Sequence, residues 1–192
     1  LKGEYLHSTH AILIRAEDGA VMMDKAASEQ AYPASITKVM TAILAIENLP
    51  DLEEQLTIPE EMFAELTEQG ASVAGFDPYE QVSVRSLLYG VLLPSGADAC
   101  ITLADYIAGS EDEFVQMMND KASELGMEHT HFVNCTGLHD PQHYTTCEDL
   151  AVLMQYCLRN DTFRTIITTR SYTTEATSAH PSGITMNDSI SS

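Results

Sequence analysis

Pro33-Ala34-Ser35-Ile36-Thr37-Lys38 opens the part of the chain that decides the fold. Apolar residues follow at the three- and four-residue spacing of a helix with one buried face. These residues are Ile36, Val39, Met40, Ile43 and Ile46. The pattern predicts a buried helix over residues 39–47, with Ser35 at or near its first turn. Lys38 follows Ser35 by three residues, so the two side chains are expected on one face, about one turn apart.

A serine and a lysine one helical turn apart can act as a nucleophile and its base. A hydroxyl is a poor nucleophile until a neighbouring group takes its proton. The free N–H groups at the start of a helix also favour negative charge on a reacting oxygen. The simpler interpretation is that Ser35 only caps the helix and that Lys38 is a solvated residue of the first turn. The S-x-x-K pattern alone does not separate these interpretations.

A second stretch, Pro94-Ser95-Gly96-Ala97-Asp98, favours the catalytic interpretation. It follows an apolar helical segment, residues 84–93, which Pro94 is expected to end. Ser95 then lies at a break between two helices, where a polar side chain can point into a cleft. An S-x-x-K followed by a second serine-containing triplet is typical of penicillin-binding proteins and class A β-lactamases.

The order of these motifs resembles the low-molecular-mass penicillin-binding proteins, the serine D-alanyl-D-alanine carboxypeptidases. The resemblance extends from residue 11 to about residue 172 and includes residues 103–110 and 132–138. It implies an α/β fold (an α+β sandwich) of the β-lactamase and penicillin-binding-protein transpeptidase-like type. In this fold an antiparallel sheet is flanked by helices and joined to a mostly helical subdomain. Residues 1–192 are expected to form a single catalytic domain.

The resemblance also implies a reaction and its residues. The expected substrate is a peptidoglycan stem peptide ending in D-Ala-D-Ala, which loses its terminal D-Ala as Ser35 is acylated. Lys38 is expected to be the base, Ser95 to pass a proton to the leaving amine, and Gly96 and Ala97 to border the substrate. β-lactam antibiotics are expected to trap Ser35 as a slow ester. This chemistry requires no metal or organic cofactor.

Two departures from the family pattern stand out. The family triplet is Ser-x-Asn, whereas position 97 is alanine and cannot bond the substrate amide. The lysines are Lys2, Lys25, Lys38 and Lys121, and none precedes Thr-Gly. The resemblance therefore implies that the domain is incomplete at its C-terminus and continues beyond Ser192 with a K-T-G strand. The alternative is a catalytically impaired or non-catalytic module of the same family that binds peptidoglycan or a partner protein.

A class A β-lactamase is the nearest enzymatic alternative, because it shares S-x-x-K. Deacylation in that family uses a glutamate within a Glu-x-x-Leu-Asn motif, and the sequence contains no such motif. Ser95-Gly96-Ala97 also resembles the carboxypeptidase triplet more closely than Ser-Asp-Asn. The sequence therefore favours the carboxypeptidase interpretation.

Cysteines and histidines offer a competing pattern. Cys135, His139, His143 and Cys147 recur every four residues, and both residue types bind zinc. This spacing aligns ligands only on a continuous helix, which Gly137 and Pro141 disfavour. A loop that wraps a metal and a Cys135–Cys147 disulfide stay open as alternatives. The other two cysteines, Cys100 and Cys157, fall on apolar helical stripes and are expected to be buried thiols.

Composition narrows the possible partners. Among 192 residues, 29 are Asp or Glu and nine are Lys or Arg, which gives a net charge of −20. Such an acidic chain argues against nucleic acid as a direct partner. No apolar run approaches the roughly 18 residues of a transmembrane helix. The family acts outside the cytoplasm, so an extracytoplasmic location is expected, either secreted or on the outer face of the bacterial membrane.

Local signals predict the remaining elements. Residues 11–16 and 20–24 are expected to form a hairpin around Glu17-Asp18-Gly19. Ser110 and Thr146 are expected to cap helices that carry acidic residues in their first turns. Residues 170–174 alternate like a strand. Residues 174–192, rich in Ser, Thr, Gly and Pro, are expected to be loop or disordered tail.

Overall fold

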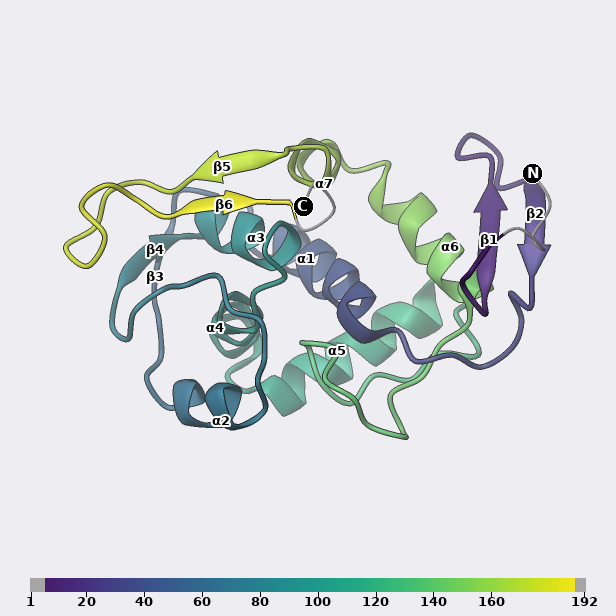
Figure 1. Cartoon of the computed structure of the whole chain (residues 1–192), viewed down its shortest axis with the longest axis horizontal. Helices are drawn as coiled ribbons and strands as arrows, with labels where there is room; N and C mark the ends of the chain where they lie inside the picture. The colour runs from purple at the N-terminus through teal and green to yellow at the C-terminus, as the bar shows by residue number, and fades with distance from the viewer. Residues whose placement is uncertain (1–5, 189–192) are drawn as a thin grey trace.

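The computed structural model describes residues 6–188 (Figure 1). The elements in chain order are β1 (Ala11–Ile14), β2 (Val21–Lys25), η2 (Ala34–Ile36), α1 (Thr37–Asn48), β3 (Gln55–Thr57), α2 (Met62–Glu68), β4 (Gln81–Ser83), α3 (Val84–Leu92), α4 (Ala97–Ala108), α5 (Glu111–Glu124), α6 (Cys147–Cys157), α7 (Asp161–Ile167), β5 (Ser171–Thr173) and β6 (Thr185–Asn187). Helices combined with short antiparallel ladders agree with the predicted α/β class.

The helix that follows Ser35 lies at the centre of the molecule (Figure 1). Residues 37–45 are all buried, and α1 packs against α3, α4, α5, α6 and α7. The predicted buried helix is confirmed, but Ile36 is wrongly placed on its stripe, because its side chain is 49% exposed. Ile36 belongs to η2, a tighter 3₁₀ turn that takes it off the buried face of α1. It borders a groove between β1 and α6 instead.

Within residues 6–188, the strands form three antiparallel ladders of two strands each, at different places in the molecule (Figure 1). β1 pairs with β2 around a turn in which Gly19 has a φ of 73°, which confirms the predicted hairpin. β3 pairs with β4, and β5 pairs with β6.

The predicted loop over residues 174–192 is wrong where residues 185–187 form β6. Met186 is buried there, opposite Tyr172 of β5, while Thr185 and Asn187 are exposed. One buried apolar residue between two polar ones is too short an alternation to stand out in a Ser- and Thr-rich segment. Residues 189–192, also part of the predicted tail, lie outside the described residues.

The predicted helix ends are confirmed. Ser110 Oγ accepts a hydrogen bond from the Glu113 N–H at 3.2 Å, and Thr146 Oγ1 accepts one from the Asp149 N–H at 3.1 Å. Each cap satisfies a backbone donor that has no partner within its helix. α3 ends two residues before Pro94, as the missing N–H of proline requires.

The cysteines are free thiols, and Cys100, Cys135 and Cys157 are buried. The prediction that Cys100 and Cys157 are buried thiols is confirmed. Burial raises the pKa of both thiols to about 12. The alternative of a Cys135–Cys147 disulfide is wrong. Cys135 packs in the hydrophobic core, whereas Cys147 lies half-buried at the start of α6. Within residues 6–188, no three His, Cys, Asp or Glu side chains gather as a metal site.

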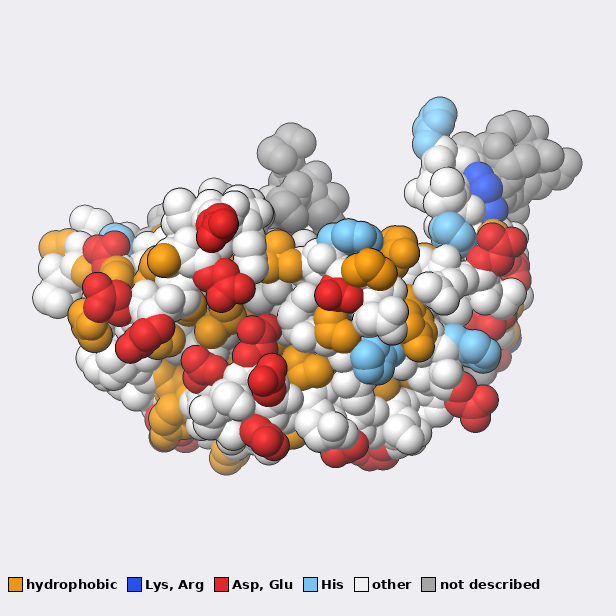
Figure 2. All heavy atoms as spheres, turned by 90° about the horizontal axis from the view of Figure 1, so that it is seen from below, with side chains coloured by type: hydrophobic (Ala, Val, Ile, Leu, Met, Phe, Trp, Pro, Cys, Tyr) orange, Lys and Arg blue, Asp and Glu red, His pale blue; other side chains and the backbone are white. Residues whose placement is uncertain are grey.

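Acidic side chains spread over the face shown in Figure 2, where basic ones are scarce. This distribution follows from the net charge of −20. Such a surface repels polyanions and attracts cationic groups. Across residues 6–188, every helix is too short or too polar to pass through a lipid bilayer.

Candidate active site

Ser35 lies exposed in η2, immediately before α1. The preceding Ala34 has a φ of 48°, which non-glycine residues rarely adopt. The Ile36 N–H donates to the Pro33 carbonyl at 3.1 Å and closes the turn. The chain therefore turns sharply before the helix. This turn exposes the Ser35 side chain to solvent just before the buried helix α1 begins.

Lys38 lies one turn further on and is almost fully buried, with 6% of its surface exposed. Its Nζ donates a hydrogen bond to the Thr136 carbonyl at 2.5 Å. A lysine side chain is rarely buried without a partner, and here the partner is an uncharged backbone carbonyl. The bond fixes the position of the amine, and among residues 6–188 no carboxylate forms an ion pair with it.

The loop of residues 134–137 packs directly on this part of the chain. Thr41 Oγ1 donates to the Cys135 carbonyl at 2.7 Å, so a second side chain of α1 bonds the loop. Asn134 Oδ1 accepts from the Gly137 N–H at 2.7 Å and closes the loop on itself. Gly137 has a φ of 83°, and a Cβ there would lie 1.9 Å from the Ala34 carbonyl oxygen. Only glycine allows this close approach.

A cavity of about 180 Å³ opens where these segments meet. Ser35 and Lys38 line it from one side and Ala97, at the start of α4, from another. The structure thus brings together three of the five predicted site residues. Ser72 and Thr136 also line the cavity, and the sequence reasoning did not identify either. The Ser72 carbonyl accepts from the Ala97 N–H at 2.8 Å.

The other two predicted site residues, Ser95 and Gly96, are not among the side chains that line this cavity. Ser95 has a φ of 62°. Its Oγ is buried, and within residues 6–188 it is the only buried side-chain nitrogen or oxygen without a hydrogen-bond partner. A Cβ on Gly96 would lie 2.7 Å from the Ala74 backbone nitrogen, so packing alone explains this glycine. The functional assignments of Ser95 and Gly96 stay predictions.

Asp98 lies next to Ala97 in the quoted motif, but no role was predicted for it from the sequence. Its fully buried carboxylate accepts the backbone N–H groups of Ala74, Gly75 and Phe76 at 2.7, 3.1 and 3.4 Å. Burial raises the pKa of this carboxyl, while these hydrogen bonds oppose the rise. Asp98 therefore ties the segment after Ser72 to the first turn of α4. An acidic residue in a helix's first turn is the sequence signal that was available.

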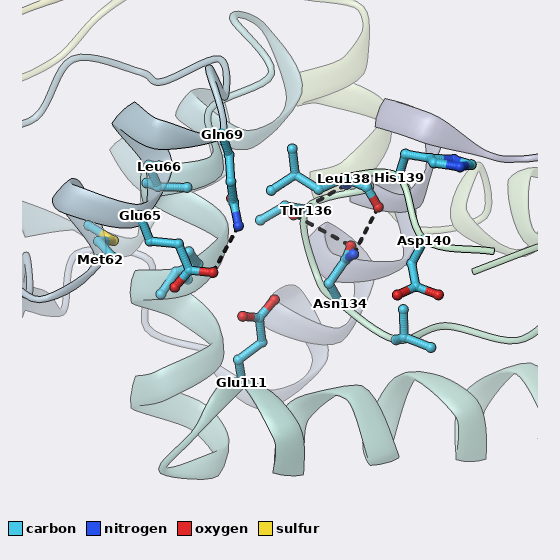
Figure 3. A pocket seen from close by; sticks show the side chains of 12 residues that line it. Met62, Glu65, Leu66, Gln69, Glu111, Asn134, Thr136, Leu138, His139 and Asp140 are labelled. Atoms are coloured by element: carbon cyan, nitrogen blue, oxygen red, sulfur yellow. Dashed lines mark hydrogen bonds between the residues drawn. The ribbon is translucent and has the colours of Figure 1, made fainter. Parts of the chain in front are cut away.

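A larger cavity, of about 360 Å³, adjoins the first and shares Thr136 and Leu138 with it (Figure 3). Figure 3 shows three carboxylates around it: Glu65 from α2, Glu111 at the start of α5, and Asp140 after the loop of residues 134–137. Glu111 Oε1 accepts from the Cys135 N–H at 2.9 Å. The larger cavity is thus acidic and lies next to the cavity that Ser35 and Lys38 line.

Comparison with known proteins identifies the group to which this arrangement belongs. The sequence matches the profile of a peptidase S11 family, described as D-alanyl-D-alanine carboxypeptidase, over residues 2–188. It is 36% identical to the D-alanyl-D-alanine carboxypeptidase DacF of Bacillus subtilis, in an alignment that covers 78% of this chain and 38% of DacF. It is 38% identical to DacC of Escherichia coli, over 74% of this chain and 37% of DacC. The chain thus spans under two fifths of the length of either relative.

Solved structures show the same fold. A variant of the Streptomyces K15 DD-transpeptidase superimposes with a TM-score of 0.90 at 30% sequence identity, covering 95% of this chain and 74% of that one. Penicillin-binding protein 6B from Escherichia coli superimposes with a TM-score of 0.83, also at 30% identity, over 96% of this chain and 59% of that one. The predicted penicillin-binding-protein transpeptidase-like fold is confirmed.

Proposed function

Because this chain belongs to the D-alanyl-D-alanine carboxypeptidase family, we propose that it carries the acylation half-site of a serine peptidase with Ser35 as the nucleophile. The substrate of the whole protein is a peptidoglycan stem peptide, from which the terminal D-Ala is removed. The observation that carries the proposal is the shared cavity. In it the exposed Ser35 and the buried Lys38 meet at the start of a helix.

The reaction follows from the chemistry of these two groups. Ser35 Oγ attacks the carbonyl carbon of the penultimate D-Ala while the neutral Lys38 amine takes its proton. The hydrogen bond to the Thr136 carbonyl uses one N–H of that amine, and the nitrogen lone pair is left for the serine proton. The C–N bond then breaks as the proton that Lys38 accepted passes by way of Ser95 to the leaving D-Ala amine, and Ser35 remains as an acyl ester. Water hydrolyses that ester.

The start of the helix supplies the electrostatic part of this proposal. A tetrahedral intermediate carries negative charge on the former carbonyl oxygen, and the Ser35 backbone N–H is the donor for it. Ala97 offers only a methyl group to the same cavity, where the family has the amide of asparagine. We therefore expect weaker binding of the substrate amide here than in relatives that carry asparagine.

The partners and location follow the same proposal. The stem peptide approaches Ser35 through the smaller cavity, and the larger cavity, which shares Thr136 and Leu138 with it, lies next to that path. β-lactam antibiotics acylate Ser35 as substitutes for the peptide. Peptidoglycan lies outside the cytoplasm, so the whole protein acts there. The names of the relatives favour this enzymatic role over that of a non-catalytic binding module.

Covalent labelling tests the proposal. The chain is incubated with a fluorescent penicillin at about pH 7 and about pH 9.5, and the adduct is located by intact mass and peptide mapping. We expect one adduct, on Ser35, at either pH. The Ser35→Ala variant should lose it by at least about a thousandfold.

Ser28→Ala is the matched control, because Ser28 is an exposed serine outside the cavity, and it should be labelled like the parent chain. An adduct that maps to another residue, or that persists in Ser35→Ala, would show that Ser35 is not the nucleophile.

A further inference from the structure

His143 lies buried between the start of α1 and the segment before the loop of residues 134–137. Its Nδ1 accepts the Val133 N–H at 3.1 Å, and its Nε2 lies 2.7 Å from Thr37 Oγ1. A backbone N–H can only donate, so Nδ1 is unprotonated. The ring proton of the neutral imidazole is therefore on Nε2 and is donated to Thr37. One tautomer of a neutral histidine satisfies both neighbours.

The two groups that His143 bonds belong to the two chain segments that meet at Lys38. Thr37 is the first residue of α1 and stands in the sequence between Ser35 and Lys38. Val133 leads directly into the loop whose Thr136 carbonyl accepts from Lys38 Nζ. The imidazole thus bridges the element that carries the lysine and the loop that holds the lysine's amine. No covalent or ionic link joins these two segments among the described residues.

The surroundings of His143 favour the neutral ring. Burial lowers its pKa to about 4, the nearby His131 adds to this effect, and Asp140 opposes it. Phe132 meets the ring edge-on at 5.5 Å between centroids. His139, with Tyr32, lines a small adjacent cavity. A protonated ring would turn both nitrogens into donors and leave the Val133 N–H facing a donor.

We propose that His143 is a positioning residue for acylation: by bonding Thr37 and Val133 together it fixes the Thr136 carbonyl, and with it the Lys38 amine, relative to Ser35. The proposal rests on the proposed function for its catalytic consequence. Its structural consequence, an ordered loop and a shielded lysine, holds whether or not Ser35 reacts. An amine displaced by about 1 Å is enough to lower a rate by about a hundredfold.

The test compares His143→Phe, which keeps an aromatic ring and removes both hydrogen bonds, with His129→Phe at an exposed histidine. Hydrogen exchange of residues 133–137 and labelling of Lys38 by an amine-reactive reagent report the structural consequence. We expect both to rise several-fold in His143→Phe and to stay unchanged in His129→Phe. The rate of penicillin acylation at Ser35 should fall about tenfold to a hundredfold.

A second pair of variants keeps the question answerable where His143→Phe fails to fold. His143→Gln keeps an N–H donor near the position of Nε2, and His143→Asn keeps an oxygen acceptor near the position of Nδ1. Each should retain part of the protection of the loop and of Lys38. Unchanged exchange and unchanged lysine labelling in a folded variant that lacks both bonds would overturn the proposal. A parent chain that forms no adduct would refute the proposed function alone, since exchange and labelling still decide the role of His143.

Discussion

The burial of polar and apolar side chains differs between the region around Ser35 and the hairpin of β1 and β2. Near Ser35 the polar groups of Lys38 and Thr41 are buried, and each bonds a backbone carbonyl of the loop of residues 134–137. On the hairpin, Val21 and Met22 are 60% and 65% exposed. The difference teaches which positions the fold depends on. Buried polar groups cost free energy when their partners are lost, whereas exposed apolar side chains already meet water.

Asp98 is expected to give the largest effect, because it is the buried polar group with the most backbone partners in the site. Asp98→Ala leaves the N–H groups of Ala74, Gly75 and Phe76 without their acceptor. Buried donors that lose their partner cost about 1–3 kcal/mol each, so the free energy of unfolding should fall by about 3 kcal/mol or more. Urea unfolding of both proteins measures this.

Asp112→Ala is the control, since Asp112 also occupies the first turn of a helix but is exposed. It should change the free energy of unfolding by no more than about 0.5 kcal/mol. Equal losses in the two variants would mean that the site region is no more dependent on its buried polar groups than the surface is.

The pH dependence of stability is expected to give an intermediate effect. The pKa of His143 is lowered from 6.5 to about 4 in the folded chain, so the unfolded chain binds more protons between these values. The contribution of the neutral ring is therefore complete above about pH 6.5 and is lost as the pH falls toward 4. In His143→Phe the decline of stability over this window should be shallower than in the parent chain.

The comparison is made by denaturant unfolding at several pH values, with His129→Phe as the control. Asp140 and His131, the charged and titratable neighbours of His143, are present in all three proteins and so do not account for a difference between them. Parallel stability curves for the parent chain and His143→Phe would contradict a buried neutral His143.

The hairpin is expected to give the smallest effect. Met22→Ala removes a side chain that is mostly in water, so the free energy of unfolding should change by no more than about 0.5 kcal/mol. Met40→Ala, the same substitution at a fully buried position of α1, should cost about 2–5 kcal/mol. Thermal or urea unfolding of the two variants measures both values. A large loss in Met22→Ala would show that the hairpin contributes to stability through this exposed residue.

Much of the fold was predictable because its signals are local. The stripe after Ser35, the caps at Ser110 and Thr146, and the stop at Pro94 each depend on residues within one or two helical turns. The failures have the same cause. β6 exists because Met186 is buried opposite Tyr172, and a pairing partner twelve or more residues away leaves no local signal.

The candidate site, too, was predictable only where its signals are local. The sequence by itself predicted Ser35 and Lys38 as nucleophile and base, because side chains at i and i+3 lie on one face of a helix. It also identified the family through motifs in a fixed order. Only the tertiary structure decided what holds them. Lys38 bonds a carbonyl 98 residues away, and Thr37 meets His143 106 residues away. Asp98 meets backbone groups more than 20 residues earlier. Contacts at such separations arise from how the helices and loops pack, and sequence spacing does not encode them.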